Sequence, residues 1–380
     1  MVKGNTTNSV QQHLTYKEMT DLGCFYTPQK FVDNLIEKIK INIPDFEKYY
    51  FLDSSSGYGT FLKSLKGLKT IGCDIDDIAI EKAISEDSQS KYYCINTLRG
   101  FNRRSIQLDN DDKIIVIGNP PYNDTTSKVK NDLKATKPCE IDSDLKTRDL
   151  GISFLLSYNK LSVDYVAVLH PLSYMIKKAN YELLKPFYSN YTLVDHSIIS
   201  SQEFSMTSKT KGFPIIIALY KRDHKGISFQ QIHDMQYKTI ENKTFTISVD
   251  SIKNYISKYP RKDKTPKEDD ILFFTMRDIN ALNRSRTFIQ DYSDNAIIID
   301  KSKLAYYCYV DVFKKYIGKL PYYYGNIDVF LNNEEFLSIQ DVFITNSVER
   351  HPWLKEKNIK WKYNNDYSLI DEYFNKLFNL

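Results

Sequence analysis

Residues 49–59 read YYFLDSSSGYG, and the architecture can be worked out from this stretch. Four apolar residues lead into Asp53, and the chain then turns through three serines and two glycines, Gly57 and Gly59. A short apolar run that stops at turn-forming residues predicts a buried strand followed by a tight turn. A helix is predicted to begin near Thr60.

Strands and helices alternate on both sides of this stretch. Apolar residues recur on one helical face over residues 31–39, and β-branched runs stop at turn residues further along. The predicted strands are 70–73, 114–117, 165–169, 192–199 and 213–220, and the predicted helices are 31–39, 78–84 and 175–187. This order predicts an α/β fold with an open, mostly parallel sheet, which binds ligands at the carboxyl ends of its strands.

The alternation weakens after about residue 225. Residues 261–270 read RKDKTPKEDD, a charged segment with a proline that is typical of a loop. We therefore expect two domains, the first over residues 1–225 and a smaller one over residues 226–380.

Composition limits the class of protein. The chain has 380 residues with 52 Lys and Arg against 48 Asp and Glu, so its net charge of +4 permits a nucleic-acid partner without requiring one. Its 5 cysteines show no metal-ligand spacing and no disulfide framework, and no metal site is predicted. Without a signal peptide or an apolar run of roughly 18 residues, we expect a cytoplasmic protein without membrane association.

The turn after the first strand predicts a nucleotide-type site. Asp53 ends the strand, and Gly57 and Gly59 let a ligand approach the backbone closely. Leu62 stands where a dinucleotide fingerprint would need a third glycine, and no Gly-Lys-Ser/Thr follows, which disfavours pyrophosphate ligands. Asp74 ends the next strand at a spacing suited to ribose hydroxyls. A ligand that contains adenosine but no phosphate groups would satisfy both carboxylates. S-adenosylmethionine is the common cofactor of this kind.

A structural interpretation of the same residues stays open. The two glycines of the turn can simply shape a loop. Asp74, Asp76 and Asp77 can form a solvated helix start, in which Asp76 or Asp77 caps the helix that follows.

Asn119-Pro120-Pro121-Tyr122 directly follows the strand 114–117 and predicts the reacting group. The amino group of a nucleobase is a poor nucleophile because its lone pair is delocalised into the ring. The Asn119 side-chain oxygen and the Pro120 carbonyl can accept its two N–H bonds, Pro121 lacks an N–H and fixes the backbone, and Tyr122 offers a face for stacking. The structural alternative is a rigid surface turn with a packed tyrosine.

Four segments taken in order resemble a known family. They are Phe25-Tyr26-Thr27-Pro28, residues 53–61, Cys73-Asp74-Ile75-Asp76, and Asn119-Pro120-Pro121-Tyr122. Over residues 20–222 the chain resembles the gamma class of DNA adenine-N6 methyltransferases of restriction-modification systems. The resemblance implies a Rossmann-like S-adenosylmethionine-dependent methyltransferase sheet with its last strand antiparallel, and a C-terminal target-recognition domain.

The resemblance also implies the site residues. Thr27 and Pro28 would touch the methionine part of S-adenosylmethionine, Asp74 the ribose, and Ile75 the adenine. The implied cofactor-binding set is Tyr26, Thr27, Pro28, Asp53, Ser54, Gly57, Gly59, Asp74, Ile75, Asn96 and Asn119, and the implied catalytic set is Asn119, Pro120, Pro121, Tyr122 and Phe204.

Two positions depart from the family pattern. The loop reads Asp-Ser-Ser-Ser-Gly where the family often has Asp-Pro-Ala-Cys-Gly, and Asn96 stands where an Asp usually meets the adenine amino group. Phe204 matches an aromatic residue that sandwiches the target base, although a packed core phenylalanine fits it equally well. For His170, at a strand end, we expect a structural role.

The implied partner is double-stranded DNA, from which the enzyme must flip its target base. A cognate restriction endonuclease acting on the same site is a possible second partner, and the source would be prokaryotic or a phage. The polar segment 123–150 carries lysines that suit phosphates. Candidate DNA contacts in the C-terminal domain are Arg277, Arg284, Arg286 and the lysine-rich and aromatic segment 353–363.

Two other functions stay open on the sequence. An Asn-Pro-Pro-Tyr methyltransferase can instead act on amino groups of RNA or on glutamine side chains of proteins, because a planar amide or base poses the same geometric problem. A DNA-binding specificity module with a decayed catalytic half is the alternative of a different class.

Overall fold

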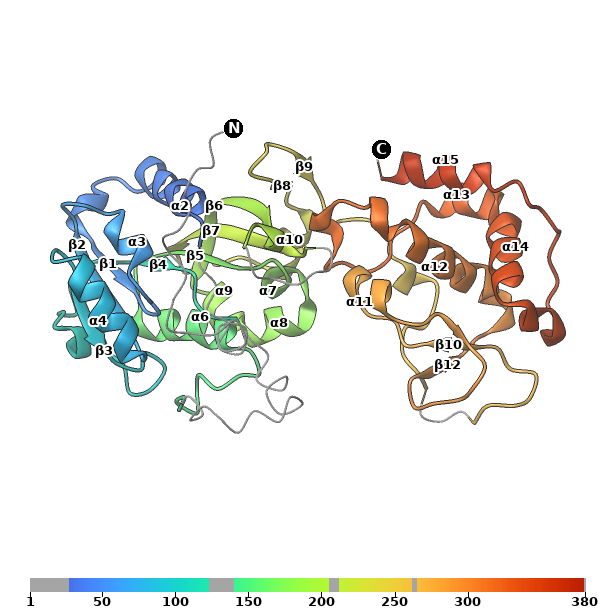
Figure 1. Cartoon of the computed structure of the whole chain (residues 1–380), viewed down its shortest axis with the longest axis horizontal. Coiled ribbons are helices and arrows are strands. Elements are labelled where there is room, and N and C mark those ends of the chain that lie inside the picture. The colour runs from blue at the N-terminus through green and yellow to red at the C-terminus, as the bar shows by residue number, and fades with distance from the viewer. Residues whose placement is uncertain (1–26, 123–139, 205–211, 262–264, 379–380) are drawn as a thin grey trace, which may run out of the picture. The chain divides into compact units, whose positions relative to one another are not determined.

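The computed structural model describes residues 27–122, 140–204, 212–261 and 265–378, which form two compact units, Met1–Phe245 and Thr246–Leu380 (Figure 1). Tyr26 and the lysines of the segment 123–139 lie outside the described residues. Among the described residues, no helix has both the length and the apolar character needed to cross a bilayer.

The first unit alternates strands and helices as the sequence predicts. Its elements are α2 (Gln29–Asn42), η1 (Phe46–Lys48), β1 (Tyr50–Asp53), α3 (Thr60–Lys63), β2 (Lys69–Asp74), α4 (Asp77–Glu86), β3 (Lys91–Cys94), η2 (Arg103–Ile106), β4 (Ile114–Gly118), α6 (Leu150–Leu161), β5 (Tyr165–Pro171), α7 (Ser173–Ile176), α8 (Lys178–Leu183), α9 (Lys185–Tyr188), β6 (Tyr191–Ser200), η3 (Ser201–Glu203), β7 (Pro214–Arg222), α10 (Phe229–Asp234), β8 (Tyr237–Lys238) and β9 (Thr244–Phe245).

Seven of these strands form one sheet in the order β3-β2-β1-β4-β5-β7-β6. β1, β2, β3, β4 and β5 pair in parallel, while β7 is antiparallel to both β5 and β6. The structure therefore confirms the mostly parallel Rossmann-like sheet with an antiparallel last strand. Since β2, β1 and β4 are neighbours, their carboxyl ends lie together at one edge.

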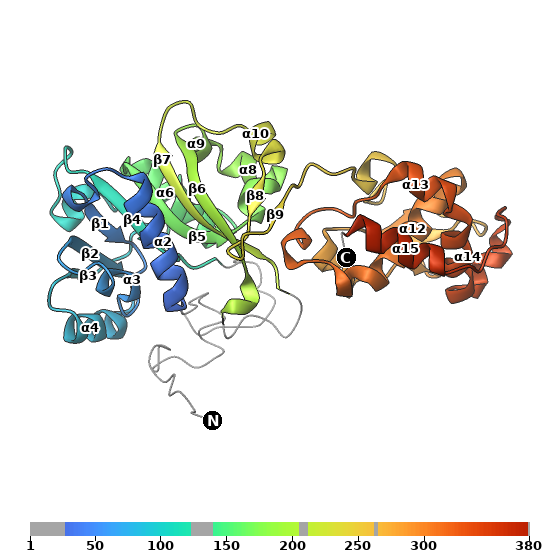
Figure 2. The same ribbon diagram turned by 90° about the horizontal axis from the view of Figure 1, so that it is seen from above.

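Helices cover both faces of this sheet. α2 crosses one face, where Phe31, Val32 and Leu35 are fully buried in a core shared with Phe51 of β1 and Ile117 of β4 (Figure 2). α6, α8 and α9 lie on the opposite side (Figure 2). The amphipathic pattern of residues 31–39 thus produces the helix that the sequence predicts.

The helix predicted over residues 175–187 is wrong as a single element. The chain forms three short helices, α7, α8 and α9, and the backbone is extended at Lys177 between the first two. Pro186 lies in the first turn of α9, where its missing N–H costs no helical hydrogen bond. The apolar periodicity therefore continued through residues at which the backbone changes direction.

The first unit extends 20 residues beyond the predicted domain boundary at residue 225, to Phe245. Tyr237 of β8 is fully buried, its ring lies against His196 of β6, and Thr239 forms a bridge with Ile198. These contacts join the segment after β7 to the edge of the large sheet, which the weaker sequence pattern there did not reveal.

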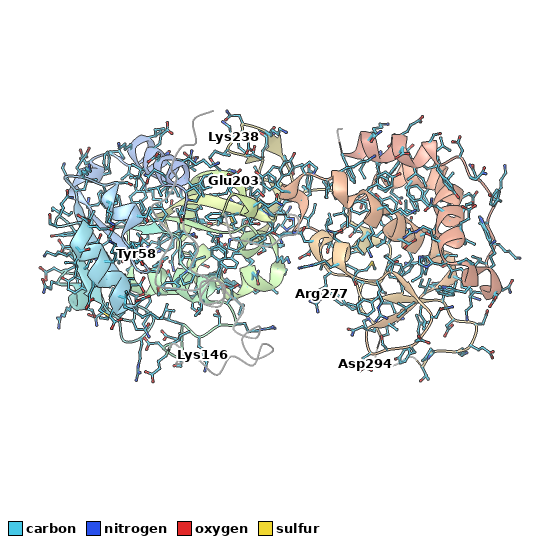
Figure 3. All side chains as sticks on the ribbon, viewed as in Figure 1. Tyr58, Lys146, Glu203, Lys238, Arg277 and Asp294 are labelled. Atoms are coloured by element: carbon cyan, nitrogen blue, oxygen red, sulfur yellow. The ribbon has the colours of Figure 1, made fainter. Side chains whose placement is uncertain are left out.

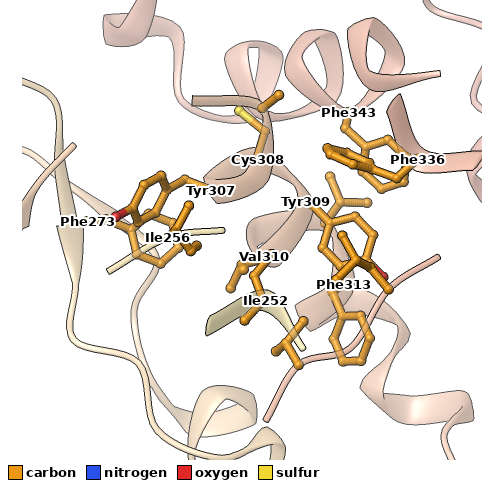
Figure 4. Close-up of a cluster of buried hydrophobic side chains, with 14 of the residues drawn as sticks. Ile252, Ile256, Phe273, Tyr307, Cys308, Tyr309, Val310, Phe313, Phe336 and Phe343 are labelled. Carbon is orange, nitrogen blue, oxygen red and sulfur yellow. The ribbon is translucent and has the colours of Figure 1, made fainter. Parts of the chain in front are cut away.

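The second unit has its own apolar core. Its elements are η4 (Ile252–Asn254), β10 (Leu272–Phe274), α11 (Ile279–Arg284), β11 (Phe288–Ile289), β12 (Ala296–Ile298), η5 (Lys301–Lys303), α12 (Leu304–Tyr316), η6 (Ile317–Lys319), η7 (Tyr322–Tyr324), α13 (Asn333–Ser338), α14 (Gln340–Arg350), η8 (Pro352–Lys357) and α15 (Ser368–Leu377). Tyr309 of α12 packs against Phe336 and Phe343 in this core, and Phe313, one turn further along α12, packs against Tyr309 and Phe330 (Figure 4).

Candidate functional site

The carboxyl ends of β1, β2 and β4 bring three predicted site residues to one edge of the sheet. Asp53 is opposite Gly72 in the register of β1 and β2, and β4 ends at Gly118, directly before Asn119. A Cβ atom placed on Gly118 would lie 2.8 Å from Asp53 Oδ1, and the φ of Gly118 is +154°. Glycine is required at this position, because a side chain would collide with the buried carboxyl group.

The turn after β1 is held to the end of β2 by a carboxylate. Gly57 has a φ of +49°, and its backbone N–H donates to Asp74 Oδ2 at 2.8 Å. The other oxygen of Asp74 accepts from Asp76 N at 3.1 Å. Burial raises the pKa of Asp74, and these backbone donors oppose the rise. Asp76 caps α4 by accepting from Ala79 N, which is one of the two capping residues that the sequence allowed. Asp74 instead holds the turn after β1 through the N–H of Gly57.

Gly59 serves packing against a tyrosine. A Cβ on Gly59 would lie 2.2 Å from Tyr92 Oη, and a Cβ on Gly72 would lie 2.5 Å from Cδ1 of the same ring. Tyr92 Oη donates to Asp87 Oδ2 at 3.0 Å. The ring from β3 therefore covers two glycines, a role for Gly59 that the sequence did not indicate. Tyr58, between Gly57 and Gly59, is labelled in Figure 3.

The three serines of the turn differ in their hydrogen bonding. Ser54 Oγ pairs with the Tyr158 hydroxyl of α6 at 2.8 Å, so this predicted cofactor contact is used inside the protein. The hydroxyl oxygens of Ser55 and Ser56 are buried and have no hydrogen-bond partner among the described residues. The sequence analysis did not include Ser55 and Ser56 among the site residues. The serines at these positions, where the family often has Ala and Cys, were the signal that could have indicated them.

Asp53 is a buried acid. Burial raises its pKa from the usual 3.8 to about 8, the nearby Asp74 carboxylate adds to the rise, and the Ser55 N–H donating to Oδ1 at 3.1 Å opposes it. Within the described residues no ion pair joins Asp53 to a cation. A buried carboxyl group without a cationic partner favours the arrival of a positively charged ligand.

The two ends of the Asn119 amide are in different states. Its nitrogen Nδ2 donates to Thr27 Oγ1 at 3.1 Å, while its oxygen Oδ1 is buried and has no partner in the part of the chain that the structure describes. Thr27 is 4% exposed and directly precedes Pro28, whose carbonyl accepts from Phe31 N at the start of α2. The structure thus brings Thr27 and Asn119, 92 residues apart in sequence, into contact.

Tyr122 is half-buried and packs against the core shared by α2 and the sheet. Burial raises the pKa of its hydroxyl. A Cβ on Gly151 of α6 would lie 3.1 Å from Tyr122 Cβ and 2.5 Å from Tyr174 Oη. The side chain of Tyr122 therefore rests against a glycine that leaves room for it.

Phe204 and Asn96 are engaged inside the protein. Phe204 is 1% exposed and its ring lies 5.9 Å from that of Phe31, which supports the packing role, so its sandwiching role stays a prediction. Asn96 Nδ2 donates to Glu140 O at 2.7 Å and Asn96 Oδ1 accepts from Leu98 N at 2.9 Å. The amide that was expected to face the adenine thus already fixes the chain after β3.

Ile75 and His170 occupy opposite environments. Ile75, the expected adenine contact, is 57% exposed beside Asp74 although it is apolar. His170 is buried, and its nitrogens pair with the Tyr220 hydroxyl at 2.8 Å and with Pro171 O at 2.9 Å. Burial lowers the pKa of His170 to about 4, so it stays neutral, which agrees with the expected structural role.

The candidate DNA contacts of the second unit lie on its surface. Arg277, which is labelled in Figure 3, is exposed, as are Arg284 and Arg286. The guanidinium of Arg286 lies 4.9 Å from the Phe274 ring centre. Trp361 Nε1 donates to Thr345 Oγ1 at 3.2 Å, so this part of the segment 353–363 packs on the unit.

No protein-family model and no curated protein matches the sequence. Solved structures with a similar fold include a putative RNA methyltransferase from Pyrococcus horikoshii, at 16% identity and a TM-score of 0.37, covering 57% of this chain and 93% of that one. A putative class I S-adenosylmethionine-dependent methyltransferase from Listeria monocytogenes has 17% identity and a TM-score of 0.37, covering 56% of this chain and 64% of that one.

A third structure is the methyltransferase subunit of a type I restriction-modification system from Streptococcus thermophilus. It has 14% identity and a TM-score of 0.39, and the match covers 52% of this chain and 44% of that one. Likenesses of this level assign neither a reaction nor a substrate to this chain. The strand order and pairing of the chain itself show the fold.

Proposed function

We propose that this chain is a site-specific DNA methyltransferase, which transfers a methyl group from S-adenosylmethionine to the N6 amino group of a flipped adenine in duplex DNA. The single observation that carries the proposal is the buried Asn119 Oδ1, which has no partner among the described residues. Native proteins rarely leave a buried acceptor unpaired, so its presence supports a ligand that donates a hydrogen bond there.

The residues at the neighbouring strand ends suit the cofactor. The backbone of the turn 54–59, the Asp74 carboxylate and the exposed Ile75 would hold a nucleoside, and the Ser55 and Ser56 hydroxyls are available for its polar groups. The cofactor supplies a methyl group activated by a positively charged sulfur. Asp53, whose pKa is raised by burial, would release its proton when the cofactor binds and would then be complementary to that charge.

The Asn-Pro-Pro-Tyr turn would prepare the attacking nitrogen. Asn119 Oδ1 and the Pro120 carbonyl accept the two N–H bonds of the amino group, which draws its lone pair out of conjugation with the ring and aims it at the methyl carbon. The nitrogen–carbon bond forms as the carbon–sulfur bond breaks, and the sulfur keeps that electron pair. The nitrogen, now positively charged, then releases one proton to water.

Stacking on Tyr122 would hold the flipped base. Extruding a base from the duplex costs a few kcal/mol, and a stacked aromatic side chain returns about 1 to 3 kcal/mol. Tyr122 is half-buried and directly follows the two prolines of the turn. The second unit would serve target recognition, with its exposed arginines as candidate readers of guanine, and a restriction endonuclease would share the recognition site.

Methyl transfer from labelled S-adenosylmethionine to mixed DNA, RNA and protein tests the proposal directly. We expect label only in DNA, as N6-methyladenine after nucleoside analysis. Asn119→Ala should abolish transfer while cofactor affinity, measured by calorimetry, is kept. Asn283→Ala, at an exposed position of α11, is the matched control and should keep full activity.

Other outcomes would replace the proposal. Label in RNA or in protein glutamine would assign one of those substrates to the same site. Tight DNA binding without any cofactor binding would indicate a decayed specificity module. Normal turnover by Asn119→Ala would refute the assignment of the reacting group.

A further inference from the structure

The Asn119 amide must present one particular end to its substrate. An amide has nearly the same shape when its oxygen and nitrogen are exchanged, but one end accepts hydrogen bonds and the other donates them. An amino group needs acceptors, so a rotation of the Asn119 amide by half a turn would place donor against donor. The chain therefore needs a group that keeps Nδ2 away from the reacting position.

Thr27 makes a contact that can hold Asn119 Nδ2 away from the reacting position. Asn119 Nδ2 donates to Thr27 Oγ1 at 3.1 Å, while Oδ1 stays buried without a partner among the described residues. Nδ2 carries a second N–H besides the one donated to Thr27 Oγ1, and the Asn119 amide also hydrogen-bonds with the Tyr122 side chain. Oδ1 is the end of the amide that has no partner among the described residues. The donated hydrogen bond also polarises the amide and makes Oδ1 a better acceptor.

The hydroxyl of Thr27 is held in place by its surroundings. Thr27 is 4% exposed, and a β-branched side chain has few accessible χ1 rotamers. It directly precedes α2, whose first turn is closed by Phe31 N donating to Pro28 O at 2.9 Å and whose Phe31 and Val32 are fully buried. The position of Oγ1 is thus fixed by the helix that covers the sheet.

We propose that Thr27 is a positioning residue that sets the orientation of the Asn119 amide, so that Oδ1 faces the amino group of the substrate. This inference rests on the proposed function, and it differs from the contact with the methionine part of the cofactor that the family resemblance implies for Thr27. It predicts that the Thr27 hydroxyl affects the rate of methyl transfer more than cofactor binding.

A pair of variants tests the hydroxyl. Thr27→Val keeps the shape and removes Oγ1, whereas Thr27→Ser keeps the hydroxyl. We expect kcat to fall roughly 3- to 10-fold in Thr27→Val, the factor that corresponds to one net hydrogen bond. The Kd for S-adenosylmethionine should stay within about twofold, and Thr27→Ser should restore most of the rate.

Three results would overturn the inference. A rise in the cofactor Kd as large as the fall in kcat would place Thr27 on the cofactor. An equal loss of rate in Thr27→Ser and Thr27→Val would indicate packing by the methyl group. A faster reaction in Thr27→Val would mean that the hydroxyl donates to Oδ1 and competes with the substrate.

A spectroscopic measurement separates this inference from the proposed function. The side-chain NH₂ signals of Asn119 can be followed by NMR in the full chain labelled with 15N-asparagine, and Asn119→Asp identifies them by their loss. Thr27→Val should shift this pair of signals and Thr27→Ser should leave it in place. If wild type transfers no methyl group, the proposed function fails, yet these spectra still decide whether the hydrogen bond exists. Unchanged signals in Thr27→Val would refute it.

Discussion

Replacing Asp53 by Asn should make the protein more stable at neutral and alkaline pH. Asp53 is 2% exposed, and burial together with the nearby Asp74 carboxylate raises the pKa of its carboxyl from 3.8 to about 8. Between pH 3.8 and about pH 8, the native state therefore keeps a proton on Asp53 that the unfolded state has released. The unfolded state binds fewer protons there, so stability falls as the pH rises.

The magnitude follows from the size of the shift. This stabilising contribution is complete below pH 3.8, the usual pKa, and is lost progressively until the pH passes about 8. Within that window the free energy of unfolding falls by about 1.4 kcal/mol for each pH unit. Its loss between pH 5 and pH 7 therefore has an upper limit of roughly 3 kcal/mol. Asparagine is nearly isosteric and carries no charge, so Asp53→Asn removes this dependence.

The assay is urea-induced unfolding of wild type and Asp53→Asn at several pH values and constant ionic strength. We expect similar free energies of unfolding at pH 4 and a growing advantage for Asp53→Asn towards pH 8. Asp111→Asn, at an exposed position in the turn before β4, is the control and should follow wild type. Parallel pH profiles for wild type and Asp53→Asn would show that the buried acid is not protonated, and the electrostatic reasoning would fail.

Three further predictions concern the same edge of the sheet. Cofactor binding at pH 7 should release close to one proton from Asp53 in wild type and none in Asp53→Asn, which calorimetry in buffers of different ionisation enthalpy measures; equal values would exclude a cation beside Asp53. Gly118→Ala, whose Cβ would lie 2.8 Å from Asp53 Oδ1, should lower the free energy of unfolding by about 1 to 3 kcal/mol. Gly318→Ala, where no atom lies within 4 Å of the added Cβ, is its control and should change little; equal losses would contradict the collision. On the proposed function, Gly151→Ala should raise KM for DNA more than it lowers cofactor affinity, because its Cβ would lie 2.5 Å from Tyr174 Oη and 3.1 Å from Tyr122 Cβ; steady-state kinetics with an unchanged KM would show that Tyr122 is not displaced.

Local patterns were sufficient for most elements of the first unit. The apolar face of residues 31–39 and the β-branched run 114–117 became α2 and β4, because their residues are buried on the faces that the pattern assigned. The predicted helix over residues 175–187 was wrong, since periodicity reports burial and does not report where the backbone turns. The contact of residues 226–245 with the sheet was missed because short strands have weak patterns.

For the candidate site, too, the sequence predicted the positions of the residues along the fold but not their individual contacts. Residue order placed Asp53, Asp74 and Asn119 at the ends of strands, and parallel pairing brings such ends to one edge. The partners of individual polar groups could not be predicted. Ser54 pairs with Tyr158, and Asn96 bonds the chain at Glu140, both across long stretches of sequence.

The sequence by itself determined the class of sheet, the edge at which chemistry is expected, and the residue types present there, because these follow from periodicity and from the order of motifs along the chain. The tertiary structure alone decided which polar groups are used internally and which remain available. Burial raises the pKa of Asp53, Asn119 Nδ2 donates to Thr27 Oγ1, and Asn119 Oδ1 has no partner among the described residues. Hydrogen bonding and burial depend on distances between segments far apart in the chain, and no local pattern encodes those distances.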